Sequence, residues 1–372
     1  MNRRDFLQTA GIVSATLAFP NAATLLATAP TQTLATWRTF EITTRIEILK
    51  PSGFTRVWLP AALTTETPFQ KTLSNKFTAT GGTAKLTENK SDALGVISAA
   101  FPEGAHPVLT STSRVATRNY SVDLSTSASA KPPKQNRVDL DHFLHPTKLL
   151  PTDGIVKSTS DEIIAKAHAT TDTEKARAIY AWIVDNTFRN PKTRGCGTGD
   201  IRFMLETGDL SGKCADLNSL YVGLARAAGL PARDVYGLRV AKSDLGYKSL
   251  GAATETITKA QHCRAEVYLS NHGWVPVDPA DVRKVVLEEP PGNRPLDDDL
   301  VQKTRARLFG SWEMNWIAYN FAHDVALPGS TGAPIGFLMY PQAETNQGRL
   351  DCLDPDNFKY EITSREITSA NT

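Results

Sequence analysis

The sequence predicts an α+β protein, in which a small all-β, sandwich-like domain precedes a mixed domain of helices and strands and a C-terminal extension or lobe. Residues 36–135 alternate with the period of two that is typical of strands, and Ser, Thr, Gly and Pro separate the short segments. Residues 150–285 contain helical periods instead. Residues 286–372 are rich in Pro, Gly and charged side chains, which sets this last part apart from the other two.

The composition is that of an ordinary globular protein. The chain has 372 residues, enough for two or three domains, of which 41% are hydrophobic and 22% charged. A formal net charge of +2 provides no basic field that would favour nucleic acid. Four cysteines without a C-x-x-C pair argue against a zinc ribbon or a disulfide scaffold, and we expect neither a metal nor a cofactor.

Residues 1–29 have the layout of a twin-arginine export signal with an uncertain cleavage site. Paired arginines stand just before Phe6-Leu7, and a mildly apolar run from Thr9 to Ala23 ends among small residues. The alternative is an amphipathic N-terminal helix of a cytosolic protein. No later stretch reaches the roughly 18 apolar residues that a membrane span needs. We therefore expect a periplasmic or secreted protein without an integral membrane segment after the signal is removed.

Strand periodicity in the first domain is clearest in four segments: Thr39–Leu49, Phe54–Leu59, Leu94–Phe101 and Arg114–Leu124. The polar segment Ser125–Pro133 predicts the exit from this domain. In the second domain we expect helix starts at Ser160 and at Thr171, where Glu174 follows an N-cap candidate by three residues. Residues 186–200 predict a Gly-rich loop.

Cys214 stands at the start of the clearest predicted helix. Leu217, Leu220 and Leu224 recur at helical spacing, and Gly229 provides the C-terminal stop. At a helix N-terminus, free backbone N–H groups and the positive dipole end favour thiolate over thiol by about 0.3–1 kcal/mol. A useful thiolate fraction at neutral pH needs a further partner, usually a histidine. For Cys214 alone, the alternative is a buried structural cysteine.

A predicted hairpin supplies two partners for this thiol, His262 and Asp278. His262, Arg264 and Glu266 share one face of a strand whose other face is apolar, and residues 271–273 are expected to form a three-residue loop. This register places Asp278 opposite Glu266, on the face of His262. Contact between His262 and Asp278 requires a bulge or a shift of two residues. A histidine can activate the thiol, and a carboxylate can orient the histidine ring.

Four blocks resemble the transglutaminase-like superfamily over roughly residues 172–281. They are Ala178-Ile179-Tyr180-Ala181-Trp182-Ile183, Gly212-Lys213-Cys214-Ala215-Asp216 with the helix through Arg233, His262-x-Arg264-x-Glu266-Val267-Tyr268, and Gly273-Trp274-Val275-Pro276-Val277-Asp278-Pro279. The resemblance implies a papain-like fold with Cys214 as nucleophile, His262 as base and Asp278 as the residue that orients the base. Cys263 departs from the family pattern, which often has a small residue there.

The resemblance also implies acyl transfer through a thioester on the cysteine. For an exported protein we expect a hydrolase, a peptidase or amidase that acts on peptide or protein amides, with cell-wall peptides among the candidates. The alternatives are a protein-glutamine transamidase and an inactive protein of this fold that binds peptide or glycan. An arylamine acetyltransferase uses a similar triad, but its acetyl-CoA is cytosolic, which conflicts with an export signal.

Two further groups of residues remain open. Cys196, Cys263 and Cys352 can supply one disulfide in an oxidising compartment, although strand alternation points Cys263 away from His262. The aromatic stretch that includes Trp312 and Trp316 can floor a substrate cleft or, as we prefer, form part of a core.

Overall fold

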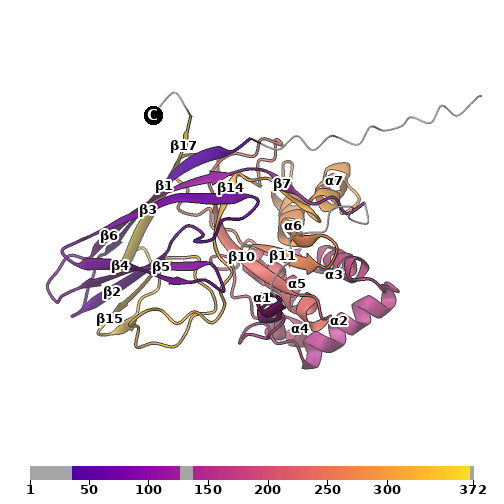
Figure 1. The fold of residues 1–372 in the computed structure, drawn as a ribbon, viewed down its shortest axis with the longest axis horizontal. Helices are drawn as coiled ribbons and strands as arrows, with labels where there is room; N and C mark the ends of the chain where they lie inside the picture. The colour runs from indigo at the N-terminus through magenta and orange to yellow at the C-terminus, as the bar shows by residue number, and fades with distance from the viewer. Residues whose placement is uncertain (1–35, 126–136, 369–372) are drawn as a thin grey trace, which may run out of the picture. The chain divides into compact units, whose positions relative to one another are not determined.

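The computed structural model describes residues 36–125 and 137–368. The proposed export signal (1–29) lies outside the described residues, as does most of the segment Ser125–Pro133. The α+β fold class is confirmed: a β-rich N-terminal region is followed by a mixed region of helices and strands (Figure 1).

Two antiparallel sheets form the sandwich. The first has the order β17-β1-β6-β3 and consists of β1 (Arg38–Ile48), β3 (Gln70–Thr80), β6 (Val108–Thr117) and β17 (Phe358–Ile367). The second has the order β16-β15-β2-β5-β4 and consists of β2 (Thr55–Pro60), β4 (Thr83–Asn89), β5 (Leu94–Phe101), β15 (Gln342–Thr345) and β16 (Gly348–Arg349). Alternate apolar residues of both sheets, such as Ile46 and Ile97, meet in one buried cluster.

The polar strands β3 and β4 were not expected from the sequence. Most of their side chains are at least partly exposed, so no apolar alternation marks them. The signal that could have found them is Gly81-Gly82 between two Thr-rich runs, a typical hairpin turn. Gly81 has φ of +77°, a conformation that favours glycine.

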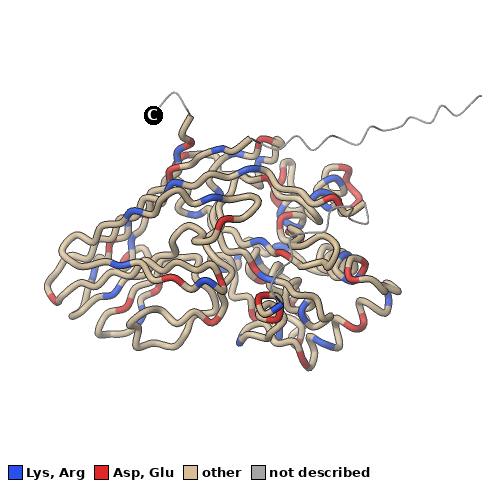
Figure 2. Tube along the Cα trace, in the orientation of Figure 1, with Lys and Arg blue, Asp and Glu red and all other residues tan. Residues whose placement is uncertain are grey.

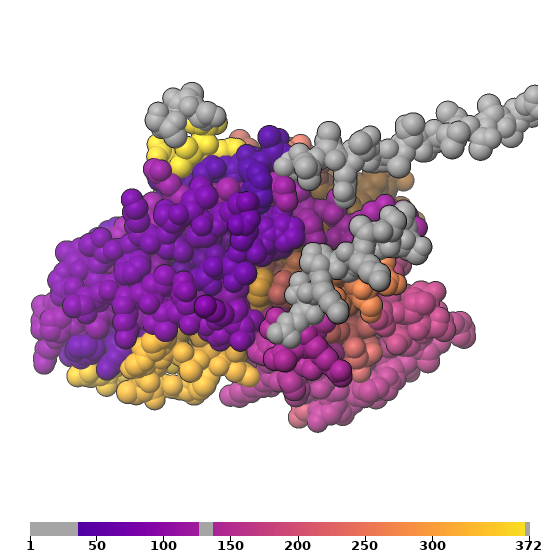
Figure 3. Space-filling model, viewed as in Figure 1, coloured from indigo at the N-terminus to yellow at the C-terminus, as the bar shows by residue number. Residues whose placement is uncertain are grey.

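The C-terminal part of the chain, expected as an extension or lobe, shares sheets with earlier parts. β17 pairs with β1, and β15 pairs with β2, so that the gold C-terminal residues in Figure 3 lie against the indigo and violet N-terminal strands. The alternation in β17 indicates a strand, but the pattern of one strand cannot specify which edge it joins. The division of the chain at residues 135, 150 and 285 stays a prediction.

A third antiparallel sheet carries the candidate site. Its order is β12-β11-β10-β14, formed by β10 (Ala232–Arg239), β11 (Arg264–Leu269), β12 (Gly273–Val277) and β14 (Trp316–Asn320). The helices are α1 (Arg137–His142), α2 (Gly154–Lys166), α3 (Asp172–Asn186), α4 (Ile201–Thr207), α5 (Cys214–Ala227), α6 (Pro279–Glu288) and α7 (Asp299–Arg307). The short strands β7 (Tyr120–Ser121), β8 (Phe188–Arg189), β9 (Ser211–Gly212) and β13 (Ser311–Trp312) complete the fold.

Helix α5 is the centre of this region. All of its residues are buried, and its apolar side chains share a core with α3 and with the inner face of β11, Ala265, Val267 and Leu269. This confirms the predicted face assignment of β11. The capping box at Thr171 and Glu174 is also confirmed. The expected helix start at Ser160 is wrong, because α2 begins at Gly154 and the Ser160 hydroxyl donates to the Leu224 carbonyl across the core.

Basic and acidic residues are interspersed along the trace in the view of Figure 2. Within the described ranges, no helix has both the length and the apolar character needed to cross a bilayer.

Candidate active site

Cys214 is the first residue of α5, as the sequence predicts, and its side chain is buried. The carboxylate of Asp216 fixes the local backbone. It accepts the N–H groups of Lys213 at 2.9 Å, Thr198 at 2.9 Å and Gly199 at 3.0 Å. One acidic side chain in the first turn thus joins the Gly-rich loop to the helix start and places the thiol at its N-terminus.

Two glycines leave room for the Asp216 carboxylate. A Cβ atom at Gly197 would lie 1.8 Å from Asp216 Oδ2, and one at Gly212 would lie 2.5 Å from the same atom. Gly197 also has φ of +95°, where a side chain is strained. The Gly-rich loop is therefore packed against the start of α5 and shapes the surroundings of Cys214.

The hairpin that carries His262 and Asp278 has a register two residues away from the expected one. Tyr268 pairs with Trp274, and Glu266 pairs with Pro276 instead of lying opposite Asp278. The reason is that Gly273, at φ of +76°, is the first residue of β12 and pairs with Leu269, so the turn starts one residue earlier than predicted. This is the shift that contact between His262 and Asp278 requires.

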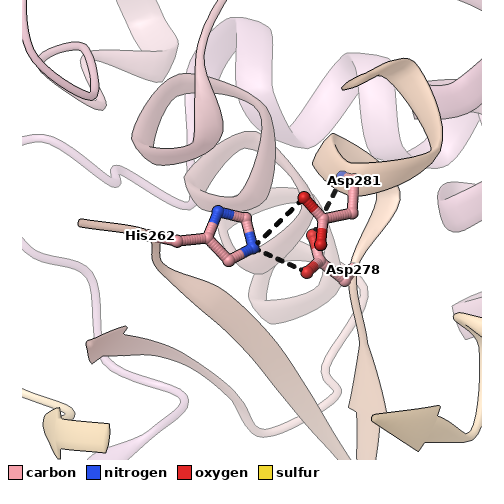
Figure 4. A group of neighbouring side chains, drawn as sticks. All are labelled: His262, Asp278 and Asp281. Carbon is pink, nitrogen blue, oxygen red and sulfur yellow. Dashed lines mark hydrogen bonds and ion pairs between the residues drawn. The ribbon is translucent and has the colours of Figure 1, made fainter. Parts of the chain in front are cut away.

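The structure brings His262 and Asp278 into contact. His262 Nε2 lies 2.8 Å from Asp278 Oδ2 and 3.4 Å from Asp281 Oδ1 (Figure 4). Asp278 is the N-cap of α6, where its side chain accepts the N–H of Asp281 at 3.1 Å. Pro279 at the first position of the helix suits this geometry. Because Nε2 faces the carboxylates, Nδ1 is the ring nitrogen left for the thiol.

Several residues that sequence reasoning missed hold this pair in place. Asn218, one turn into α5, donates to Asp278 Oδ1 at 3.2 Å and to the Cys263 carbonyl at 2.9 Å. The indole N–H of Trp316 donates to the His262 carbonyl at 2.8 Å. Trp312 and Trp316 are fully buried, so the aromatic stretch forms core and supports the histidine. The spacing from Cys214 to Asn218, one helical turn, is the signal that could have indicated Asn218.

Two buried arginines balance the two carboxylates. Arg239 Nη2 lies 2.5 Å from Asp281 Oδ1, and Arg264 Nε lies 3.6 Å from Asp278 Oδ2. Against burial, Arg239 holds the pKa of Asp281 well below its usual range, whereas burial and the Asp281 charge raise the pKa of Asp278. His262, Asp278 and Asp281 lie close enough together to ligate a cation. The two guanidinium groups already supply the countercharge, so ion pairing accounts for the cluster.

The electrostatics favour a thiolate beside an imidazolium. The thiols of Cys196 and Cys263, together with the His262 ring, hold the pKa of Cys214 well below its usual range against the effect of burial. Burial and Arg239 disfavour the charged ring of His262, but Asp281 and Asp278 outweigh them and raise the pKa of His262. The two shifts are in the directions that an ion pair between Cys214 and His262 needs.

Three of the four cysteines lie together. Cys196, Cys214 and Cys263 share one buried cluster, and all four are free thiols. Cys263, which strand alternation was expected to point away from His262, lies in the same buried cluster as the Cys214 side chain. Strand alternation does not reach it, because β11 begins one residue later, at Arg264. Cys196 accepts the Tyr340 hydroxyl at 3.1 Å, while Cys352 is only partly buried.

A cavity of about 660 Å³ opens beside Cys214 and His262, which both line it. Its walls come from the Gly-rich loop, the segment 258–262 and the C-terminal segment around β17. The cavity therefore provides space for a ligand beside both side chains.

The comparisons with known proteins agree with this architecture. The family model described as "Transglutaminase-like superfamily" matches residues 157–279. A Haemophilus influenzae protein described as "Uncharacterized protein" is 36% identical over 344 residues, which cover 88% of this chain and 91% of the relative. A solved structure from Cytophaga hutchinsonii, described as "a Putative Cysteine Protease", has 16% identity and a TM-score of 0.50, and the match covers 89% of this chain and 99% of that chain. The chain belongs to the transglutaminase-like superfamily.

Proposed function

We propose that this protein is an exported, cysteine-dependent hydrolase that cleaves peptide or protein amide bonds through a thioester on Cys214. The observation that carries the proposal is the position of Cys214 at the start of α5, with His262 held by Asp278 at 2.8 Å beside it. The lowered pKa of Cys214 and the raised pKa of His262 support a reactive thiolate.

The chemistry follows from these groups. The Cys214 thiolate adds to the amide carbonyl carbon, and the electron pair of the C=O double bond moves to oxygen, which the backbone N–H of Cys214 at the start of α5 can stabilise. As this intermediate collapses, the C–N bond breaks and His262 Nδ1 gives its proton to the leaving amine. Water then adds to the thioester while His262 takes its proton, and cleavage of the S–C bond restores the thiolate and the imidazolium.

Hydrolysis and transamidation differ only in the acceptor, water or an amine. We favour water as the acceptor. The paired arginines and the apolar run at the N-terminus indicate export by the twin-arginine route, and a peptide hydrolase would find substrates outside the cytoplasm. Transamidation between proteins is the second candidate. An inactive binding protein has no use for a lowered thiol pKa, and the arrangement around Cys214 speaks against it.

Trapping the acyl-enzyme tests the proposal. The purified chain is mixed with a peptide-amide library, quenched in acid and weighed as intact protein, with C214A as the inactive variant and C352A as the matched control. We expect an acyl adduct on wild type and C352A that decays in water and leaves no amine-coupled product when a primary alkylamine is added. An adduct resolved mainly by the amine would indicate a transamidase, and an unacylated wild-type chain would refute thioester chemistry.

A further inference from the structure

The charged side chains that line the cavity beside Cys214 are all basic. Its lining contains seven Lys or Arg residues and no Asp or Glu: Arg189, Arg194, Lys213, Arg239, Lys259, Lys284 and Lys359. The whole chain is nearly neutral, with 41 basic and 39 acidic residues. The positive charge in the cavity is therefore a local concentration, which the composition of the chain does not account for.

Carboxylates behind the lining balance part of this charge. Arg239 pairs with Asp281, Arg194 lies 2.5 Å from Asp351, and Glu288 contacts both Arg189 and Lys284. The remaining cations are Lys213, Lys259 and Lys359, for which the described part of the chain provides no ion pair. Lys213 is partly buried next to the thiol, while Lys259 and Lys359 are exposed.

A buried amide adds a neutral donor to the same cavity. Gln261 lines it directly before His262, and the residue is 9% exposed. The Tyr360 hydroxyl lies near Gln261 Nε2. Within the described residues, however, no acceptor has the distance and angle that a hydrogen bond from Nε2 requires. A buried donor left without an acceptor is destabilising, and a bound ligand oxygen would relieve that cost.

We propose that this cavity binds a carboxylate of the substrate, so that the enzyme prefers peptides with an anionic group close to the scissile amide. Three unbalanced ammonium groups and one free amide N–H form a set of donors with no carboxylate among the lining residues, and a carboxylate is the anion that peptides themselves carry. The inference rests on the proposed function. The carboxylate can come from an acidic side chain or from a free C-terminus.

Alkylation of Cys214 measures the electrostatic effect of the basic cavity lining and needs no known substrate. Iodoacetate and iodoacetamide differ in one negative charge, so the ratio of their rates at Cys214 reports the potential in the cavity. We expect K259E/K359E to lower this ratio about five- to tenfold at low salt, an effect that shrinks at about 0.5 M salt; a change in the thiolate fraction of Cys214 enters both rates and cancels in the ratio. The matched control K85E/K90E reverses two exposed lysines outside the cavity lining and should leave the ratio unchanged.

An equal ratio in wild type, K259E/K359E and K85E/K90E would overturn the proposal, even with a fast iodoacetamide reaction. A slow iodoacetamide reaction in wild type would instead refute the activated thiol. If thermal melting shows that K259E/K359E does not fold, K259Q/K359Q takes its place, with about half the effect on the logarithm of the ratio.

Peptide binding to C214A separates the two carboxylate sources and does not depend on catalysis. Four peptides combine Glu or Gln next to the reactive amide with a C-terminal carboxylate or carboxamide. Tighter binding of both Glu peptides indicates a side-chain carboxylate, and tighter binding of both acids indicates the C-terminus. Equal affinity for all four, measured by fluorescence anisotropy at low salt, would overturn the proposal.

Discussion

Replacing Asp278 by Asn separates its electrostatic role from its structural one. The Asp278 side chain caps α6 through the N–H of Asp281 and accepts His262 Nε2 at 2.8 Å. An Asn side chain can keep the cap with its oxygen, since Asn and Asp are comparable N-caps. Its NH2 group, however, would then face the ring nitrogen and could not accept from an imidazolium. We therefore expect a folded protein with an altered thiol.

The size of the effect follows from that hydrogen bond. A charge-assisted hydrogen bond contributes about 1.5–3 kcal/mol, which corresponds to about 10- to 100-fold in the population of the thiolate–imidazolium pair. Since Asp278 and Asp281 raise the pKa of His262, D278N lowers this pKa, so the imidazolium is lost at lower pH and the Cys214 thiolate forms only at higher pH. The rate of iodoacetamide labelling of Cys214 at pH 7 should fall about 10- to 100-fold.

Asp281→Asn is the matched comparison, because both carboxylates face the same ring nitrogen. Asp281 lies farther from His262, at 3.4 Å, and pairs with buried Arg239 at 2.5 Å. D281N leaves that guanidinium without its partner and should lower the free energy of unfolding by about 3–5 kcal/mol in a urea titration. Wild-type labelling in D278N together with a tenfold slower reaction in folded D281N would refute the assignment of Asp278 as the orienting residue.

Three further measurements probe the surroundings of the thiol and the scaffold. Burial raises the pKa of Cys352 to about 11, so at pH 7 about 10⁻⁴ of it is thiolate, and Cys214 should label far faster; equal labelling would contradict the activated thiol. Gly197→Ala forces a Cβ onto Asp216 and should cost about 2–4 kcal/mol in urea unfolding, and wild-type stability would show that the loop yields. Backbone N–H groups at the start of α3 lower the pKa of Glu174 to about 2; this stabilisation is present above about pH 4.5 and lost towards pH 2, so the melting temperatures of Glu174→Ala and wild type should converge on acidification, and a constant gap would reject the cap.

Much of the fold and the site could be predicted because local patterns specify them. The helical spacing after Cys214 and the alternation through Ala265 and Val267 each depend on residues close in sequence, and both elements formed as expected. The hairpin register depended on where one turn begins. A glycine at positive φ can be the last residue of the loop or the first residue of the following strand, so the sequence did not fix the start of the turn. Helical spacing places Asn218 one turn after Cys214, but its contact with Asp278, like the contact of Asp281 with His262, arises only from the approach of α5 and α6 in three dimensions.

The edge pairing of β1 with β17 has a consequence for how the chain reaches its folded state. Arg38 and Glu366 form an ion pair across this edge although they stand 328 positions apart. During synthesis one edge of β1 therefore stays unpaired until nearly the whole described chain has been made. Such long-range pairing slows folding. The first sheet can be completed only after β17 has been synthesised, and a chain cut short before β17 would leave the edge of β1 unpaired.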